Sequence, residues 1–70
     1  MLETYVGKFV VIEFTNGARS QRTIAYVVSV QDGFITLEAP STRKQYSVNV
    51  NSVIEISELP KDQVRPEYRR

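Results

Sequence analysis

The chain contains neither cysteine nor histidine. Without cysteine it can form no disulfide and offers no thiolate to a metal, and the lack of histidine removes the other common zinc ligand. We therefore expect no metal site and no cofactor. A chain of 70 residues buries only about 60% of the surface that its unfolded form exposes. Since disulfides and zinc are excluded, oligomerisation is the expected source of additional stability.

Long apolar runs are missing as well. The unbroken apolar stretches, such as residues 9–12, are only a few residues long, far short of the length that crosses a bilayer. The first residues, MLETYVGK, have no basic segment followed by an apolar one, so they do not read as a signal peptide. These features predict a cytoplasmic protein with no membrane partner.

The chain also lacks a strong excess of either charge, with a net charge of +1. Residues 1–60 carry five basic and six acidic side chains, whereas residues 61–70 carry four basic and two acidic ones. The part expected to fold is therefore not a basic body of the kind that binds nucleic acid mainly through charge.

No catalytic constellation is present. The serines have no histidine partner, and the three glycines form no phosphate-binding cluster. The carboxylates fall in no recognisable motif. We expect that the protein is not an enzyme and has no catalytic residue.

What the sequence does contain is the alternation of β-strands. The positions of Leu2, Tyr5 and Val6 before Gly7 predict a short N-terminal helix. Apolar residues then recur with a period of two in five segments, residues 8–14, 19–30, 34–39, 45–50 and 53–56. Val10, Ile12 and Phe14 are expected to face the core, as are Ile35 and Leu37.

Turn signals separate these segments. Asn16-Gly17 lies between two apolar-rich runs and predicts a hairpin centred on that pair, and Gln31-Asp32-Gly33 predicts the next turn. The second segment is longer than a usual strand, so we expect a bulge near Thr23 to Ala25.

The elements together predict an all-β fold, a strongly bent five-stranded antiparallel barrel of the SH3-like type with a short N-terminal helix. The barrel domain is expected over residues 1–59, and residues 60–70 are expected to form a charged, flexible tail. Phe9 and Val11 would then point away from the core. Either the N-terminal helix or another subunit could cover them.

Two motifs resemble the Sm/LSm family of Hfq-like proteins over residues 2–57. The family's first motif, roughly G-x-x-V-x-V-x-L-x-N-G, matches without a gap at Gly7, Val10, Ile12, Phe14, Asn16 and Gly17. Its second motif, approximately I-R-G-N-N-V-L-Y-I, aligns with VNVNSVIEI and matches at Val48, Asn51, Val53, Ile54 and Ile56.

The resemblance implies a homo-oligomeric ring of five to seven subunits that binds single-stranded RNA at loops near its pore. Ring closure would pair the fourth strand with the fifth strand of a neighbour, because these strands are the expected edges of the sheet. The implied subunit interface consists of Tyr46, Val48, Val50, Val53, Ile54 and Ile56. The candidate RNA-binding residues are Asp32, Phe34, Arg43, Lys44, Asn49 and Asn51.

Each candidate RNA contact has a structural alternative. Phe34 could stack on a base or pack, and Asn51 could read a base edge or form an Asx turn. Arg43 and Lys44 could clamp a phosphate or remain solvated. The family's base-binding D-x-x-x-N segment has no counterpart here, and Asn49-Val50 replace its Arg-Gly pair. A protein-binding assembly or adaptor module is therefore the alternative function.

Overall fold

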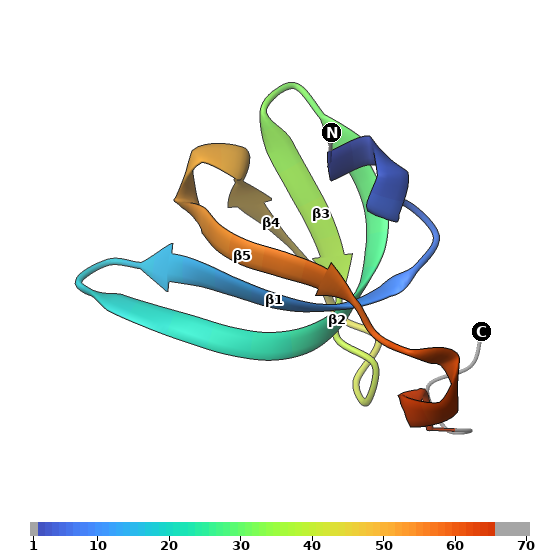
Figure 1. Cartoon of the computed structure of the whole chain (residues 1–70). Helices are drawn as coiled ribbons and strands as arrows, with labels where there is room; N and C mark the ends of the chain where they lie inside the picture. Colours follow the sequence, from blue (N-terminus) through green and yellow to red (C-terminus); the bar gives the residue numbers. More distant parts are fainter. Residues whose placement is uncertain (1, 66–70) are drawn as a thin grey trace.

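The computed structural model describes residues 2–65 and arranges them around one antiparallel sheet of five strands (Figure 1). A 3-10 turn, η1 (Leu2–Tyr5), precedes the sheet, and two more, η2 (Val50–Ser52) and η3 (Lys61–Gln63), flank the last strand. The mainly β fold and the short N-terminal helical turn are confirmed. The strands are β1 (Phe9–Asn16), β2 (Arg19–Gln31), β3 (Phe34–Glu38), β4 (Gln45–Asn49) and β5 (Val53–Glu58).

The strand order is β4-β3-β2-β1-β5, so β4 and β5 are the edges, as predicted. The long strand β2 joins the two halves of the sheet. Its first half pairs with β1 from Arg19 to Tyr26, and its second half pairs with β3 from Tyr26 to Gln31. Figure 1 shows β2 curving strongly, so that β1 and β5 run across the direction of β3 and β4.

The core lies on the concave side of this bend. Val10, Ile12 and Phe14 are buried, which confirms the inward row of β1. Ile35 and Leu37 are also confirmed, with no exposed surface. Ala25, Val27 and Val48 complete the buried cluster, and Tyr5 of η1 packs against it.

The irregularity in β2 lies further along the chain than expected. Residues 19–26 pair with β1 in continuous register, so the bulge predicted near Thr23 to Ala25 is wrong. Instead the register with β3 shifts between Val27 and Ser29, which leaves Val28 as the extra residue. A bulge reverses the alternation of side chains. Val27 and Val30, three residues apart, therefore face the core opposite Leu37 and Ile35.

The first hairpin turn is displaced by one residue from the expected centre. Asn16 pairs with Arg19, so the two loop residues are Gly17 and Ala18 rather than Asn16 and Gly17. Gly17 has a φ of 69° and Ala18 has no positive φ, the pattern of a type II′ turn. Asn16 is thus the last residue of β1.

The second turn agrees with the sequence. Asp32 and Gly33 connect paired residues Gln31 and Phe34, and both have a positive φ, 56° and 81° respectively. Two positive values define a type I′ turn, for which Asp-Gly is a favoured pair. A backbone hydrogen bond from the Val50 N–H to the Gly33 carbonyl further fixes this turn.

Strand β5 carries a bulge of its own. Ile56 pairs with Ile12 and Val53 with Phe14, and the register shift between them leaves Ile54 as the extra residue. Ile54 is 54% exposed. The bulge therefore turns a large apolar side chain outward at the edge of the sheet.

The outer face of β1 contacts the C-terminal segment. Phe9 and Tyr26 make an edge-to-face ring contact with centroids 5.1 Å apart. The backbone N–H of Leu59 donates to the Phe9 carbonyl over 2.9 Å, and Leu59 is 5% exposed. η1 packs on the core through Tyr5, and the coverage of Phe9 and Val11 by the N-terminal helix or by another subunit stays a prediction. Of the predicted tail, residues 61–63 form η3 and residues 66–70 lie outside the described residues.

Two truncations separate the core from the exposed aromatic. Leu37→Ala removes a side chain with no exposed surface and should lower the free energy of unfolding by about 2–5 kcal/mol. Phe34→Ala removes a ring on a residue that is 48% exposed and should cost about 1 kcal/mol or less. Urea denaturation followed by circular dichroism measures both. Equal losses would contradict the assignment of these two side chains.

Candidate functional site

Two connections that are distant in sequence meet at one end of the sheet, which we term the turn end. The β2–β3 turn and η2 are joined there by a hydrogen bond of 2.9 Å from the Val50 N–H to the Gly33 carbonyl. Phe34 pairs across the strands with Asn49. The fold thus brings together four of the six candidate RNA-binding residues, Asp32, Phe34, Asn49 and Asn51.

Asn49, not Asn51, forms the Asx-type turn expected before the last strand. Its Oδ1 accepts a hydrogen bond of 2.8 Å from the Asn51 N–H and caps η2. The side-chain oxygen of Asn49 is therefore already engaged in a structural hydrogen bond. The Asn51 side chain is exposed and makes no hydrogen bond within residues 2–65, so it remains free to bind a ligand.

Phe34 presents about half of its surface to solvent. Its neighbour Ile35 faces the core with no exposed surface, and alternation along β3 turns Phe34 to the opposite face. The ring therefore does not pack in the core, and a face of this kind can stack on a base or on a cation.

Arg43 and Lys44 lie at the opposite end of the β3–β4 hairpin from Phe34. The hairpin pairs Phe34 with Asn49 at one end and Glu38 with Gln45 at the other, next to the loop that holds both basic residues. In a single chain these two side chains cannot share a site with Phe34.

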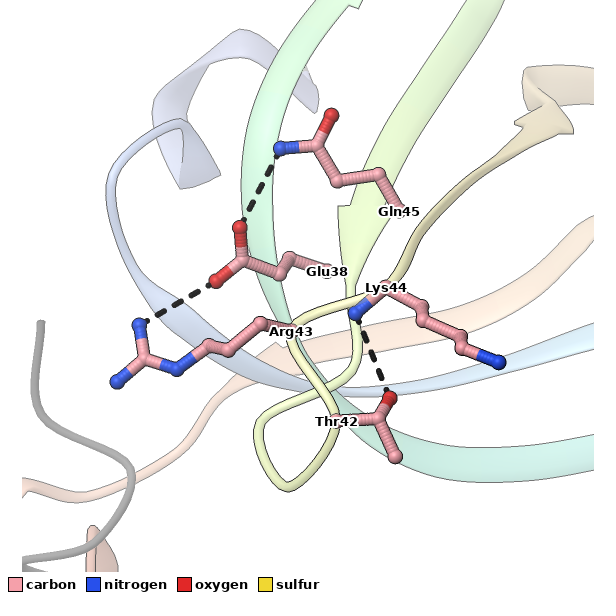
Figure 2. A network of polar contacts seen from close by, with 5 residues as sticks. All are labelled: Glu38, Thr42, Arg43, Lys44 and Gln45. Carbon is pink, nitrogen blue, oxygen red and sulfur yellow. Dashed lines mark hydrogen bonds and ion pairs between the residues drawn. The ribbon is translucent and has the colours of Figure 1, made fainter.

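Arg43 holds a buried carboxylate (Figure 2). Its Nη1 lies 3.5 Å from Oε2 of Glu38, and Gln45 Nε2 donates to Oε1 of Glu38 over 3.3 Å. Glu38 is only 4% exposed, and a buried carboxylate needs such partners. Arg43 adopts a φ of 63°, unusual for a residue with a side chain, to make this contact.

The sequence analysis did not single out Glu38, because the carboxylates fall in no recognisable motif. The register places Glu38 between Tyr26 on β2 and Gln45 on β4. Only cross-strand pairing reveals those neighbours, so the sequence carried no direct signal.

Besides Arg43, two cations are paired with carboxylates across the sheet. Lys8 lies 3.4 Å from Glu58, and Arg22 bridges two acids, 3.1 Å from Glu55 and 3.7 Å from Glu13. Among residues 2–65, the basic side chains without an ion pair lie at the hairpin tip, in the β3–β4 loop and after β5. They are Arg19, Lys44, Lys61 and Arg65. None of them is in η1, η2 or the β2–β3 turn.

A groove of about 560 Å³ opens at the turn end, between η1 and the β2–β3 turn. Its walls are mainly aliphatic, and its polar lining includes two carboxylates but no lysine or arginine. The lining residues are Leu2, Glu3, Val30, Gln31, Asp32, Gly33, Val50 and Val53.

A second hollow, of about 410 Å³, lies along edge strand β4 and faces the β1–β2 hairpin. Phe14 and Tyr46, with ring centroids 6.4 Å apart, contribute its aromatic side chains. Burial raises the pKa of the Tyr46 phenol above its ordinary value. No charged side chain lines this cleft, whose other residues are Thr15, Asn16, Gln21, Ser47, Val48, Asn49 and Ser52.

The predicted interface residues divide into two groups. Tyr46, Val50, Val53 and Ile56 are partly buried against the core of their own subunit, and Val48 is 8% exposed. Ile54 alone of the six is largely exposed. Ile54 is therefore the residue best placed to contact another molecule without first disturbing its own fold.

A comparison of the chain with protein-family models, curated proteins and solved structures finds no significant match. Within residues 2–65, no cluster of three or more acidic, histidine or cysteine side chains is placed to hold a metal ion. Nor does that part of the chain contain a helix long and apolar enough to cross a membrane.

The two asparagines of η2 should differ in their contribution to stability. Asn49→Ala removes the cap on the Asn51 N–H and should lower the free energy of unfolding by about 1 kcal/mol. Asn51→Ala removes an exposed side chain and should change it by less than about 0.5 kcal/mol. Thermal unfolding of both variants tests this. A larger loss for Asn51→Ala would show that the cap is not formed by Asn49.

Proposed function

We propose that the chain is an Sm-like β-barrel module that assembles into a homo-oligomeric ring and works as a protein-binding assembly or adaptor module. The observation that carries this proposal is the pair of unpaired edge strands. One edge strand, β4, borders an uncharged cleft, and the other, β5, exposes the apolar side chain of Ile54.

Unpaired strand edges expose backbone groups that another strand can satisfy. Neither β4 nor β5 contains the lysine or proline that commonly protects an edge. The two acids of β5 do not stand alone at the edge, because Glu55 is bound by Arg22 and Glu58 by Lys8. Pairing β4 with β5 of the next subunit is a heterologous contact, which gives a ring when the rotation closes.

The small core adds a second reason for assembly. Tyr46, Val50 and Val53 are only partly buried in the single chain, and they lie where the sheet ends. A neighbouring strand along β4 would cover the cleft that Tyr46 and Val48 line and would complete the burial of Tyr46. Each subunit would then gain the apolar contacts that 70 residues provide poorly alone.

The distribution of charge favours a protein over RNA as the bound partner. Phosphate binding depends on basic side chains, and the turn end contributes Glu3 and Asp32 to its groove but no lysine or arginine. Arg43 and Lys44 are the two basic residues among the RNA-binding candidates, and they lie at the other end of the β3–β4 hairpin. Arg43 is in addition held by Glu38.

Binding of single-stranded RNA is the second candidate because of Phe34. Its half-exposed ring directly follows the β2–β3 turn, and the exposed Asn51 amide lies in η2. A backbone hydrogen bond joins η2 to that turn. A ring would repeat this pair in every subunit, and single-strand recognition commonly combines stacking with contacts to base edges.

The ring is tested with one substitution at the edge and one matched control. Ile54→Lys places a charge on the exposed bulge of β5 and should dissociate the assembly while leaving the subunit folded. Val6→Lys changes another aliphatic residue, 42% exposed and outside the strands, and should leave the assembly intact. Sedimentation at micromolar concentration should give several times the mass of one chain for the wild type and for Val6→Lys. A folded wild-type monomer would refute the ring.

RNA binding is tested with oligo-U and oligo-A at low and high salt. If Phe34 stacks on a base, Phe34→Ala should weaken binding by roughly 5- to 150-fold, since a stacked base contributes about 1–3 kcal/mol. Asn51→Ala should weaken it as well, and Asp62→Asn, on η3, should not. Absence of binding by the folded protein at low salt would leave the protein-binding role alone.

A further inference from the structure

The groove at the turn end combines aliphatic walls with acidic polar groups. Its apolar surface is formed by four residues, each from a different element: Leu2 of η1, Val30 of β2, Val50 of η2 and Val53 of β5. Its volume of about 560 Å³ lies within the range of about 300–1,000 Å³ of typical ligand pockets. It can therefore receive one or two apolar side chains of a partner.

Asp32 supplies a negative charge, which gives this groove a preference for positively charged partners. Asp32 is exposed and makes no ion pair within the described part of the chain. Glu3 on η1 is a second lining carboxylate, and hydrogen bonding with the N-terminal amine lowers its pKa, so Asp32 is the carboxylate available to a partner. No basic side chain is among the lining residues. Acidic groups next to an apolar surface complement a partner that carries lysine or arginine beside an apolar residue.

The groove is also preorganised. Asp32 and Gly33 form a type I′ turn with φ values of 56° and 81°. The hydrogen bond from the Val50 N–H to the Gly33 carbonyl ties this turn to the adjacent η2, which also lines the groove through Val50. A rigid site loses little entropy when it binds.

We propose that this groove binds a short segment of a partner protein that presents an aliphatic side chain between basic ones. The aliphatic side chain would enter between Leu2, Val30 and Val53, and a lysine or arginine would pair with Asp32. This inference rests on the proposed protein-binding role and names the class of partner. It also assigns to the turn end a ligand whose charge is opposite to that of RNA.

The test uses three blocked pentapeptides titrated into the labelled full-length protein. The first is Gly-Lys-Leu-Lys-Gly, the second replaces both lysines with glutamate, and the third replaces leucine with serine. The first peptide should shift the backbone amide resonances of Gly33 and Val50, and the other two should bind more weakly. Oligo-U is titrated in parallel as a probe of the alternative ligand.

Asp32→Asn is the informative variant. Asparagine accepts the positive φ of this turn position as well as aspartate does, so only the charge is lost. The first peptide should bind about two- to fivefold more weakly, as expected for a solvent-exposed ion pair. The difference should shrink at about 0.5 M salt because of screening. Asp62→Asn removes an exposed carboxylate on η3, away from the groove, and should have no effect.

The outcomes separate this inference from the ring. Equal binding of the basic and acidic peptides, equal effects of Asp32→Asn and Asp62→Asn, or shifts caused by oligo-U alone would each overturn the inference. No peptide binding by a protein that still sediments as a ring would overturn the inference and leave the ring standing. Peptide binding by a monomeric protein would support the inference and refute the ring.

Discussion

The bend of β2 at Val28 is the constraint on which the rest of the structure depends. A single extra residue opposite β3 reverses the alternation of side chains, so that Val27 and Val30 both face the core. One strand can then serve two halves of the sheet that run in different directions (Figure 1). Without this reversal, Val30 would face away from Ile35 and from the core.

The second bulge, in β5, likewise lets two residues that are an odd number of positions apart face the core, here at the other edge of the sheet. Val53 and Ile56 are three residues apart, yet both lie opposite inward residues of β1 that are two apart, Phe14 and Ile12. The cost is that Ile54 projects into solvent at an edge strand. A core feature thus creates an exposed apolar surface at the edge of the sheet.

Ion pairing distributes the charges of this small domain in a way that affects its partners. Arg22 neutralises Glu13 and Glu55, which lie directly opposite each other on β1 and β5. Arg43 stabilises the buried Glu38. Cations used in this way are poorly available for phosphates, and the turn end exposes the carboxylate of Asp32. The sheet therefore resembles a nucleic-acid-binding surface less than the positions of Phe34 and Asn51 alone would indicate.

The sequence by itself determined the class of fold, the strands, their edges and the inward rows of β1 and β3. These follow from local alternation and from turn residues such as Asp32-Gly33, whose conformational preferences do not depend on distant contacts. The tertiary structure alone decided the bulge at Val28, the loop residues Gly17 and Ala18, and the cap by Asn49. It also decided that Arg43 holds Glu38 and that the predicted RNA-binding residues divide between two ends of the sheet. Register and cross-strand neighbours set these features, and both depend on how the whole sheet bends, which no local pattern contains.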